Sequence, residues 1–554
     1  MKAMSRRAGS IAFWALAATL AAQASAADVP RPVNINVDAS KSEGALPPVW
    51  RFFGADEPNY ATMKDGRKLL VELGNLRRGE VYFRTHNLLN TGDGTPAFKW
   101  GSTNAYTETR DGKPVYDWTV VDRIIDTYLA RGIHPYLQIG FMPEALSTAP
   151  PGVPYQHPWR PGFDYKMIAT GWSYPPASYE KWGELVYQWT LHNVERYGRD
   201  EVAKWYFEVW NEPNLSVYWQ GTPQDFYRLH DVAIAAVRRA LPGARVGGPD
   251  VAGAGGAFMD GFLAHVAETG TPTDFLSFHA KGRPSFVDGH VRMGISTQLQ
   301  EIDNGFKKIA AVRALAARPI VIGESDPEGC AACPGPQNAY RNGTMYSSYT
   351  AASFARVWDL AHKHQVNLEG VLSWAFEFED QPWFAGYRQL STNGVNLPVL
   401  NVFRMFAKLG PERISAASDA QIPLDEIVAN GVRGAADVGV LATRTAQGAI
   451  ALMLWNYHDD DVPGPEAAVR LTIKSPGHKP GAATIWRVDE AHGNAFAAWK
   501  SMGSPQSPNA TQYEQLEKAS ALESQSLPLP PVRRGSVQLD VSVPRQGIAL
   551  VVLE

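Results

Sequence analysis

The sequence predicts an α/β fold: a (β/α)8 TIM barrel with an accessory antiparallel β-sandwich. Two observations predict the barrel. Residues 48–410 contain eight short runs of β-branched and aromatic residues, and longer amphipathic runs follow them. A third observation predicts the sandwich, because residues 411–554 change to short alternating runs separated by Gly, Pro, Asp and Asn. A chain of 554 residues is long enough for both domains.

The strand candidates of the barrel are, in chain order, VWRFFGADE, VYFRTHNLL, HPYLQIGFM, WYFEVWNE, ARVGGPD, FLSFHAKG, PIVIGES and GVLSWAFEF. Residues 118–132 and 178–198 have apolar side chains at helical spacing, and each run ends on glycine. Thr222 is followed by a proline and then an acid, so a helix is predicted to begin there. Gly/Pro-rich stretches such as 152–163 are expected as elaborated loops at the strand ends.

The accessory domain is predicted to include an early strand. Residues 27–47 contain the run VNINVDAS, which precedes the barrel and is expected to pair with the sandwich. The segment 502–531 lacks a clear period and predicts a long surface excursion.

The first 26 residues predict a secretory signal peptide. Basic residues precede an apolar run at 11–22, and Ala24-Ser25-Ala26 has the small side chains of a cleavage site. The apolar run is about half of the roughly 20 residues that span a bilayer. We therefore expect an exported protein without a membrane span, in a periplasm or outside the cell. In such a protein Cys330 and Cys333 predict a local disulfide, with an isolated thiol pair as the alternative.

Composition excludes several kinds of partner. Hydrophobic residues make up 45% of the chain and charged residues 19%, with a net charge of −4. These values indicate neither a nucleic-acid-binding surface nor a polybasic membrane surface. We expect a partner that is neutral or small. The sequence shows no ligand-spaced His/Asp cluster, and it predicts no metal or other cofactor.

Polar residues end several of the predicted barrel strands, at the face where TIM barrels place their active sites. They are Arg84, His86, Asn211, Glu212, His279, Lys281, Glu324, Asp326, Trp374, Glu377, Glu379 and Asp380. Glu212 and Glu324 each follow an apolar run. Two carboxylates facing one ligand suit hydrolysis of a glycosidic bond, because one protonates the departing oxygen while the other attacks the anomeric carbon or activates water. The alternatives are a structural salt bridge for Glu212 and a turn acid for Glu324. Glu208 lies in mid-strand, and we expect it to form a structural ion pair.

Four motifs occur in a fixed order along the chain: VYFRTHNLL, VWNEPNL, FLSFHAKG and VIGESDP. With the trailing sandwich, they make nearly all of the mature chain resemble glycoside hydrolase family 39, the family of β-xylosidases and α-L-iduronidases. The resemblance implies a retaining enzyme with Glu212 as acid/base, Glu324 as nucleophile and Asn211 on the 2-hydroxyl of the sugar. The other substrate-binding residues that it implies are His86, His279, Trp374 and an acidic partner, Glu379 or Asp380.

Lys281 departs from the pattern of many β-xylosidases, which have an aromatic hydroxyl at this position, and is similar to the lysine in the HRKG of iduronidases. An α-L-iduronide has the ring configuration of a β-D-xyloside plus a carboxylate at C5, so a cation near C5 would distinguish them. Alternatively, Lys281 pairs with Asp326 or Asp380. We predict an exo-acting β-xylosidase that releases xylose from short oligosaccharides. An α-L-arabinosidase, a uronide hydrolase and a non-catalytic sugar-binding barrel are the alternatives.

Overall fold

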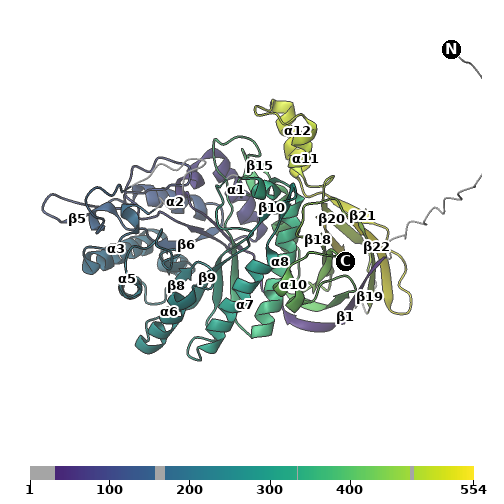
Figure 1. Cartoon of the computed structure of the whole chain (residues 1–554), viewed down its shortest axis with the longest axis horizontal. Coiled ribbons are helices and arrows are strands. Elements are labelled where there is room, and N and C mark those ends of the chain that lie inside the picture. The colour runs from purple at the N-terminus through teal and green to yellow at the C-terminus, as the bar shows by residue number, and fades with distance from the viewer. Residues whose placement is uncertain (1–31, 156–168, 334, 475–479) are drawn as a thin grey trace, which may run out of the picture.

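The structure is a computed structural model that describes residues 32–155, 169–333, 335–474 and 480–554. The predicted signal peptide at 1–26 and part of the predicted long loop, residues 156–163, lie outside the described residues. Figure 1 shows a barrel with surrounding helices, coloured purple to teal, beside a sheet drawn largely in green and yellow.

The barrel is closed by eight parallel strands, and each overlaps one of the eight predicted runs, with ends that differ by at most two residues where they extend beyond it. This confirms the predicted barrel. Around it the strands follow the order β12 (Ile320–Asp326), β13 (Leu368–Ser373), β2 (Phe52–Ala55), β3 (Val81–Thr85), β6 (Ile133–Ile139), β7 (Tyr206–Val209), β8 (Arg245–Val251) and β9 (Phe275–Lys281).

Helices cover the outside of the barrel, and their predicted starts are found. The Ser178 side chain accepts a hydrogen bond from the backbone of Lys181, and Thr222 forms a capping box with Asp225. Within the described residues, no helix has the length and apolar character to cross a membrane. The main helices are α1 (Lys64–Leu76), α2 (Thr119–Leu129), α3 (Tyr179–Tyr197), α5 (Pro223–Ala240), α6 (Gly256–Thr269), α7 (Ile295–Ala311), α8 (Thr344–His364) and α9 (Pro398–Phe406).

Shorter elements lie in the connections. They are the 3-10 helices η1 (Pro58–Thr62), η2 (Glu144–Leu146), η4 (Gly171–Ser173) and η5 (Pro336–Asn342), the helix α4 (Arg199–Val202), and three paired-strand units: β4 (Tyr106–Glu108) with β5 (Pro114–Tyr116), β10 (Ser285–Val287) with β11 (His290–Arg292), and β14 (Ser391–Thr392) with β15 (Val395–Asn396).

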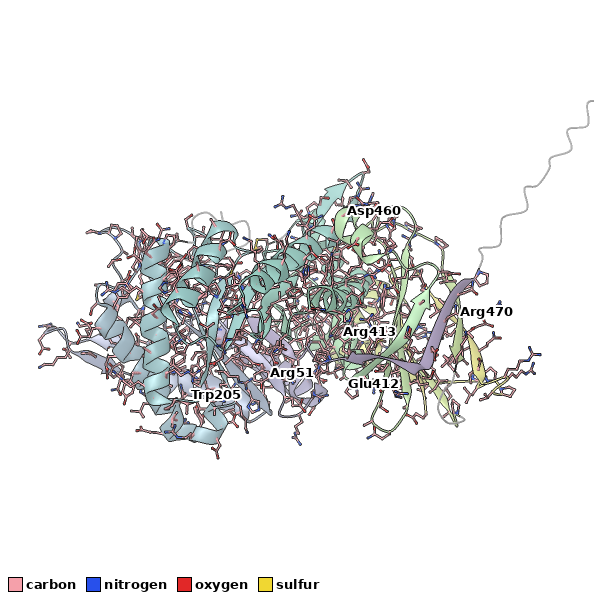
Figure 2. All side chains as sticks on the ribbon, turned by 90° about the horizontal axis from the view of Figure 1, so that it is seen from below. Arg51, Trp205, Glu412, Arg413, Asp460 and Arg470 are labelled. Atoms are coloured by element: carbon pink, nitrogen blue, oxygen red, sulfur yellow. A yellow bond between two sulfur atoms is a disulfide. The ribbon has the colours of Figure 1, made fainter. Side chains whose placement is uncertain are left out.

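The second sheet has nine strands and includes the first described strand of the chain. That strand, β1, pairs antiparallel with β16 and parallel with β19, and it lies among the C-terminal strands in Figure 2. The order is β21 (Ser524–Leu527), β20 (Ala483–Val488), β23 (Ile548–Leu553), β18 (Ile450–Tyr457), β17 (Asp437–Arg444), β16 (Glu412–Ser418), β1 (Val33–Ala45), β19 (Ala467–Lys474) and β22 (Ser536–Val543). These strands form one continuous sheet, so the two layers of a sandwich stay a prediction.

Both faces of this sheet are buried along β18. Met453 and Trp455 belong to the same apolar core as the barrel, whereas Leu452 and Leu454 belong to a second core inside the sheet domain. Alternate residues of a strand point to opposite faces, which explains why the run IALMLWNY is apolar at nearly every position. The barrel and the sheet therefore share a core.

The excursion predicted at 502–531 contains regular structure that its weak periodicity does not predict. Helix α12 (Ala510–Ser520) begins with a capping box between Asn509 and Gln512, and it follows α11 (Ala495–Ser501). The signal for α12 was therefore its cap rather than an apolar stripe. A further short helix, α10 (Leu424–Asn430), lies between β16 and β17.

Candidate active site

Strand register brings the residues of β9 and β12 together at the carboxyl end of the barrel. Glu324 is paired with His279, and Asp326 with Lys281. The Nζ atom of Lys281 lies 2.6 Å from Glu324 Oε2 and 2.5 Å from Asp326 Oδ2. Lys281 thus makes the expected alternative contact with Asp326 and also reaches Glu324.

His279 joins the two glutamates that were expected to carry the chemistry. Its Nδ1 atom lies 2.8 Å from Glu212 Oε1 and 3.8 Å from Glu324 Oε2, and its Nε2 atom lies 2.8 Å from Asp250 Oδ2. Burial disfavours a charged imidazole, but Asp250 and Glu324 outweigh it and raise the pKa of His279 to about 10. His279 is therefore a cation that donates hydrogen bonds to Glu212 and Asp250.

Glu324 is buried among positive charges. Burial opposes its ionisation, but His279, Lys281 and Arg84 outweigh that cost and hold the pKa of Glu324 well below its usual range. The Nη1 atom of Arg84 lies 3.6 Å from Glu324 Oε1. A carboxylate kept ionised in this way can act as a nucleophile.

A buried network centred on Arg84 forms the floor of the site. The Nε atom of Arg84 donates to Glu208 Oε2 at 2.6 Å, and its Nη2 atom contacts Asp250. Tyr136 donates its hydroxyl to the other oxygen of Glu208 at 2.7 Å. Glu208 is thus the structural ion-pair member that its mid-strand position predicts. Removing one partner of such a buried network leaves an uncompensated charge, so the floor resists rearrangement.

His86 and Asn211 lie beside Glu324, on the Arg84 network. Burial, followed by the charge of Arg84, lowers the pKa of His86 to about 3, so its ring is neutral. Its Nδ1 atom lies 2.9 Å from Asp56 Oδ1, and its Nε2 atom lies 3.1 Å from Arg84 Nη1 and 2.9 Å from Asn211 Oδ1. Asn211 Oδ1 accepts from Arg84 at 3.1 Å, while its buried Nδ2 has no hydrogen-bond partner in the described part of the chain. This free donor is available to a ligand.

Trp374 is buried next to His86, with 4.3 Å between ring centroids. Its backbone N–H donates to Asp326 Oδ1 at 2.9 Å. A Cβ atom at Gly54 would fall 2.5 Å from the indole, so the ring can lie against strand β2 only because position 54 is glycine. The structure therefore places Trp374 in the wall of the site.

Glu379 and Asp380 are not joined to this cluster by any contact in the described structure. Glu379 Oε1 accepts hydrogen bonds from the backbone N–H groups of Asp65 and Gly66, at 2.8 and 2.7 Å. These groups belong to the first turn of α1, which a carboxylate stabilises. Asp380 is exposed to solvent.

A cavity of about 510 Å³ opens beside Glu212 and Lys281. The segment after β9 lines this cavity, and so does the loop that carries Cys330 and Cys333. The lining residues are Glu212, Leu215, Ala252, Gly253, Lys281, Gly282, Arg283, Pro284, Thr297, Glu301, Glu328, Gly329, Cys330, Cys333, Gln337, Asn338 and Arg341.

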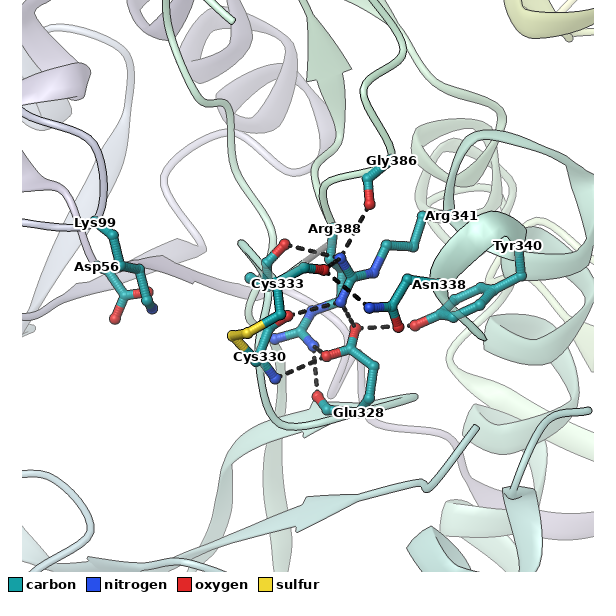
Figure 3. Close-up of a disulfide and its surroundings, with 11 residues drawn as sticks. Asp56, Lys99, Glu328, Cys330, Cys333, Asn338, Tyr340, Arg341, Gly386 and Arg388 are labelled. Carbon is teal, nitrogen blue, oxygen red and sulfur yellow. Dashed lines mark hydrogen bonds and ion pairs between the residues drawn. A yellow bond between two sulfur atoms is a disulfide. The ribbon is translucent and has the colours of Figure 1, made fainter. Parts of the chain in front are cut away.

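Cys330 and Cys333 form a disulfide, as predicted, with their Cα atoms 5.4 Å apart. Figure 3 shows the arginines and Glu328 gathered around it. Arg341 donates to the backbone carbonyls of both cysteines, and Glu328 accepts from the Cys330 N–H at 2.8 Å. Arg388 pairs with the same glutamate at 2.5 Å. These contacts hold the loop as a wall of the cavity.

Sequence reasoning missed three residues of this region: Asp56, Asp250 and Lys99. The two aspartates follow or end apolar strands, so the signal that selected Glu212 also applied to them. Lys99 lies in the loop between β3 and β4, and no pattern marked it. Its side chain nevertheless pairs with Asp56.

Comparison with known proteins places these features in a family. The chain matches the model of Glycosyl hydrolases family 39 over residues 33–537. A β-xylosidase of Geobacillus stearothermophilus is 29% identical over 418 residues, covering 72% of this chain and 73% of that protein. An α-L-iduronidase of Mus musculus is 26% identical over 418 residues, covering 67% and 61%. The crystal structure of the GH39 enzyme from Xanthomonas axonopodis pv. citri has the same fold, with a TM-score of 0.72, 22% identity, and coverage of 95% and 99%. The chain belongs to glycosyl hydrolase family 39 and is a glycoside hydrolase.

Proposed function

We propose that this enzyme is an exo-acting, retaining β-xylosidase that releases xylose from xylo-oligosaccharides. One observation carries the proposal: Glu212 and Glu324 face the same nitrogen of His279, and three cations keep Glu324 ionised. The β-xylosidase from Geobacillus stearothermophilus supports the choice of sugar.

The reaction is a double displacement. Glu324 attacks C1 of the glycon while Glu212 gives its proton to the departing oxygen, and a glycosyl-enzyme ester forms. Glu212 then takes a proton from water, which attacks C1 and releases Glu324. Asn211 donates its free Nδ2–H to the 2-hydroxyl, and charged His279 orients Glu212.

The spacing of the carboxylates supports retention. Retaining pairs lie roughly 5–5.5 Å apart, whereas inverting pairs begin at roughly 6.5 Å because they must admit water. Glu212 Oε1 and Glu324 Oε2 lie 2.8 and 3.8 Å from one nitrogen of His279. These two oxygens could reach the inverting separation only if the three atoms were nearly collinear.

Lys281 bears on the choice between a xyloside and a uronide. Its ammonium already has two carboxylate partners, Glu324 and Asp326, so its charge is balanced without an acidic sugar. This favours the neutral xyloside. Lys281 also lines the cavity, and the iduronidase relative shares the family, so a uronide is the second candidate. An α-L-arabinoside, which differs from the xyloside at C4, is the third.

A panel of three nitrophenyl glycosides tests the substrate. We expect kcat/KM for the β-D-xyloside to exceed that for the α-L-arabinoside and the α-L-iduronide by at least about tenfold, because misplaced or unpaired polar groups cost that much. Nitrophenol release is the measurement.

Each of the other results on the panel contradicts the proposal and indicates a specific alternative. A preference for the iduronide that Lys281→Ala removes would make the protein a uronide hydrolase. A preference for the arabinoside would change the sugar but not the reaction. Sugar binding without release of nitrophenol from any of the three would identify a non-catalytic barrel.

We also propose an exported protein with the predicted division of the chain: a leader at 1–26, a strand segment at 27–47, the catalytic barrel at 48–410 and the accessory sandwich at 411–554. The Cys330–Cys333 disulfide supports an oxidising compartment. N-terminal sequencing of the protein recovered outside the cytoplasm is expected to begin at Ala27. An uncleaved chain retained in the cytoplasm would contradict the proposal.

A further inference from the structure

Lys99 reaches the site from a loop rather than from a strand end. Its side chain is buried, with 7% of its surface exposed, and its Nζ atom contacts Asp56. Asp56 is bonded to His86, whose Nε2 atom lies 3.7 Å from Glu324 Oε1. Figure 3 shows Lys99 and Asp56 side by side, apart from the disulfide and its arginines. The described residues that line the cavity beside the disulfide do not include Lys99 or Asp56.

The position of Lys99 is costly for the fold. A buried ammonium loses its hydration, and an apolar residue of similar volume often stabilises a protein more than a buried ion pair does. The backbone at Lys99 also has a φ of 61°, in the left-handed region that is unfavourable for a residue with a long side chain. Strain and buried charge in one loop residue are typical of functional sites.

The charges around Lys99 are those of the active site. Burial is the largest effect and lowers the pKa of Lys99 to about 7, while Glu324 and Glu212 raise it and Arg388 and Lys281 lower it further. The neighbouring Asp56 carboxylate favours the charged form as well. The ammonium thus lies in the field of both proposed catalytic carboxylates.

Within the described residues, the side chain of Lys99 has more N–H donors than ion-pair partners. An ammonium carries three N–H groups, and within the described residues Asp56 is its one ion-pair partner, whereas Lys281 has two. A sugar hydroxyl both donates and accepts hydrogen bonds, so a lysine beside a carboxylate can satisfy it in both directions.

We propose that Lys99 and Asp56 form a donor–acceptor pair that binds a glycon hydroxyl at C3 or C4, remote from the reacting carbon. The inference rests on the proposed function. Asn211 and Glu324 serve the C1–C2 side of the ring, and His86 lies between them and Asp56. Lys99 is thus a specificity-determining residue of the glycon subsite.

The test compares Lys99→Met with the unmutated enzyme on the nitrophenyl glycoside that it cleaves fastest and on the 3-deoxy and 4-deoxy analogues of that glycoside. Methionine retains length and packing but removes the N–H donors. We expect kcat/KM on the parent glycoside to fall about 10- to 100-fold, as for loss of a charged hydrogen bond. On the analogue that lacks the bound hydroxyl, kcat/KM of Lys99→Met is expected to be less than about threefold below that of the unmutated enzyme.

Two further variants separate binding from folding. Lys99→Gln retains amide donors, and it is expected to recover part of the loss on the parent glycoside only. Lys113→Met is the matched control, because Lys113 is an exposed lysine. If Lys99→Met lowers kcat/KM equally on the parent glycoside and on both analogues, or does not lower it on the parent, the proposed role of Lys99 is wrong. The proposed function of the enzyme would not be affected by either result. If the unmutated enzyme cleaves none of the three nitrophenyl glycosides of the panel (β-D-xyloside, α-L-arabinoside and α-L-iduronide), both the proposed function and this inference are rejected.

Discussion

Glu324→Ala is expected to lower turnover of a nitrophenyl β-xyloside by roughly 10⁴-fold or more, because Glu324 is the group that the proposed mechanism uses to form the glycosyl-enzyme ester. The cavity left by the side chain admits a small anion, and the cations that hold Glu324 would attract it. Azide is therefore expected to restore part of the activity. It attacks C1 directly, so the product is the glycosyl azide of inverted configuration.

The measurement combines nitrophenol release with NMR assignment of the anomeric product. Glu195→Ala is the control for loss of one glutamate, since Glu195 is exposed on α3, and it is expected to leave turnover unchanged. Glu324→Gln, which retains the shape of the side chain, checks that inactivity does not come from misfolding. A first product of inverted configuration from the unmutated enzyme would refute the nucleophile assignment.

Glu212→Ala is expected to show a loss that depends on the leaving group. Xylobiose needs a proton on its departing oxygen, so kcat/KM is expected to fall roughly 10²- to 10⁴-fold. A dinitrophenyl xyloside has a leaving group that departs without protonation, and it is expected to form the glycosyl-enzyme almost as fast as before. Azide then intercepts that intermediate and yields the product of retained configuration, because Glu324 is still present.

The comparison across leaving groups is the measurement, with pre-steady-state nitrophenol release for the activated substrate. Glu301→Ala is a suitable companion variant, because Glu301 lines the same cavity and accepts a hydrogen bond from the Lys281 backbone. Any fall in kcat/KM that Glu301→Ala causes is expected to be of the same size for xylobiose and for the dinitrophenyl xyloside. A Glu212→Ala variant that loses as much on the dinitrophenyl xyloside as on xylobiose would not lack an acid/base, and another donor would have to be found.

Most residues of the candidate site could be predicted from the polar residues that end apolar runs in the sequence. Glu212, His279 and Glu324 could be selected because an apolar run that stops on a polar residue identifies the carboxyl end of a barrel strand. The same reasoning also selected Glu379, whose carboxylate instead caps the first turn of α1. Position in the chain cannot separate helix capping from substrate binding or catalysis, because a glutamate side chain can serve all three.

The charge state of the site could not be predicted from the sequence. His86 and His279 belong to two motifs of similar appearance, yet one ring is neutral and the other is a cation. Burial and the charge of Arg84, which is only two residues away in the same motif, dominate around His86, whereas Asp250 and Glu324, which lie on other strands, outweigh burial around His279. Such pKa shifts depend on distances of a few ångströms between strands, which only the closed barrel sets.

By itself, the sequence determined the eight barrel strands, the caps of two helices, the disulfide and the family, because these depend on local periodicity, turn chemistry and motif order. The tertiary structure alone decided that Lys281 contacts Glu324, that Glu379 faces α1, and that Lys99 reaches Asp56 from a loop. Contacts of this kind join residues far apart in the chain, and a charged side chain has no preferred partner until folding buries it.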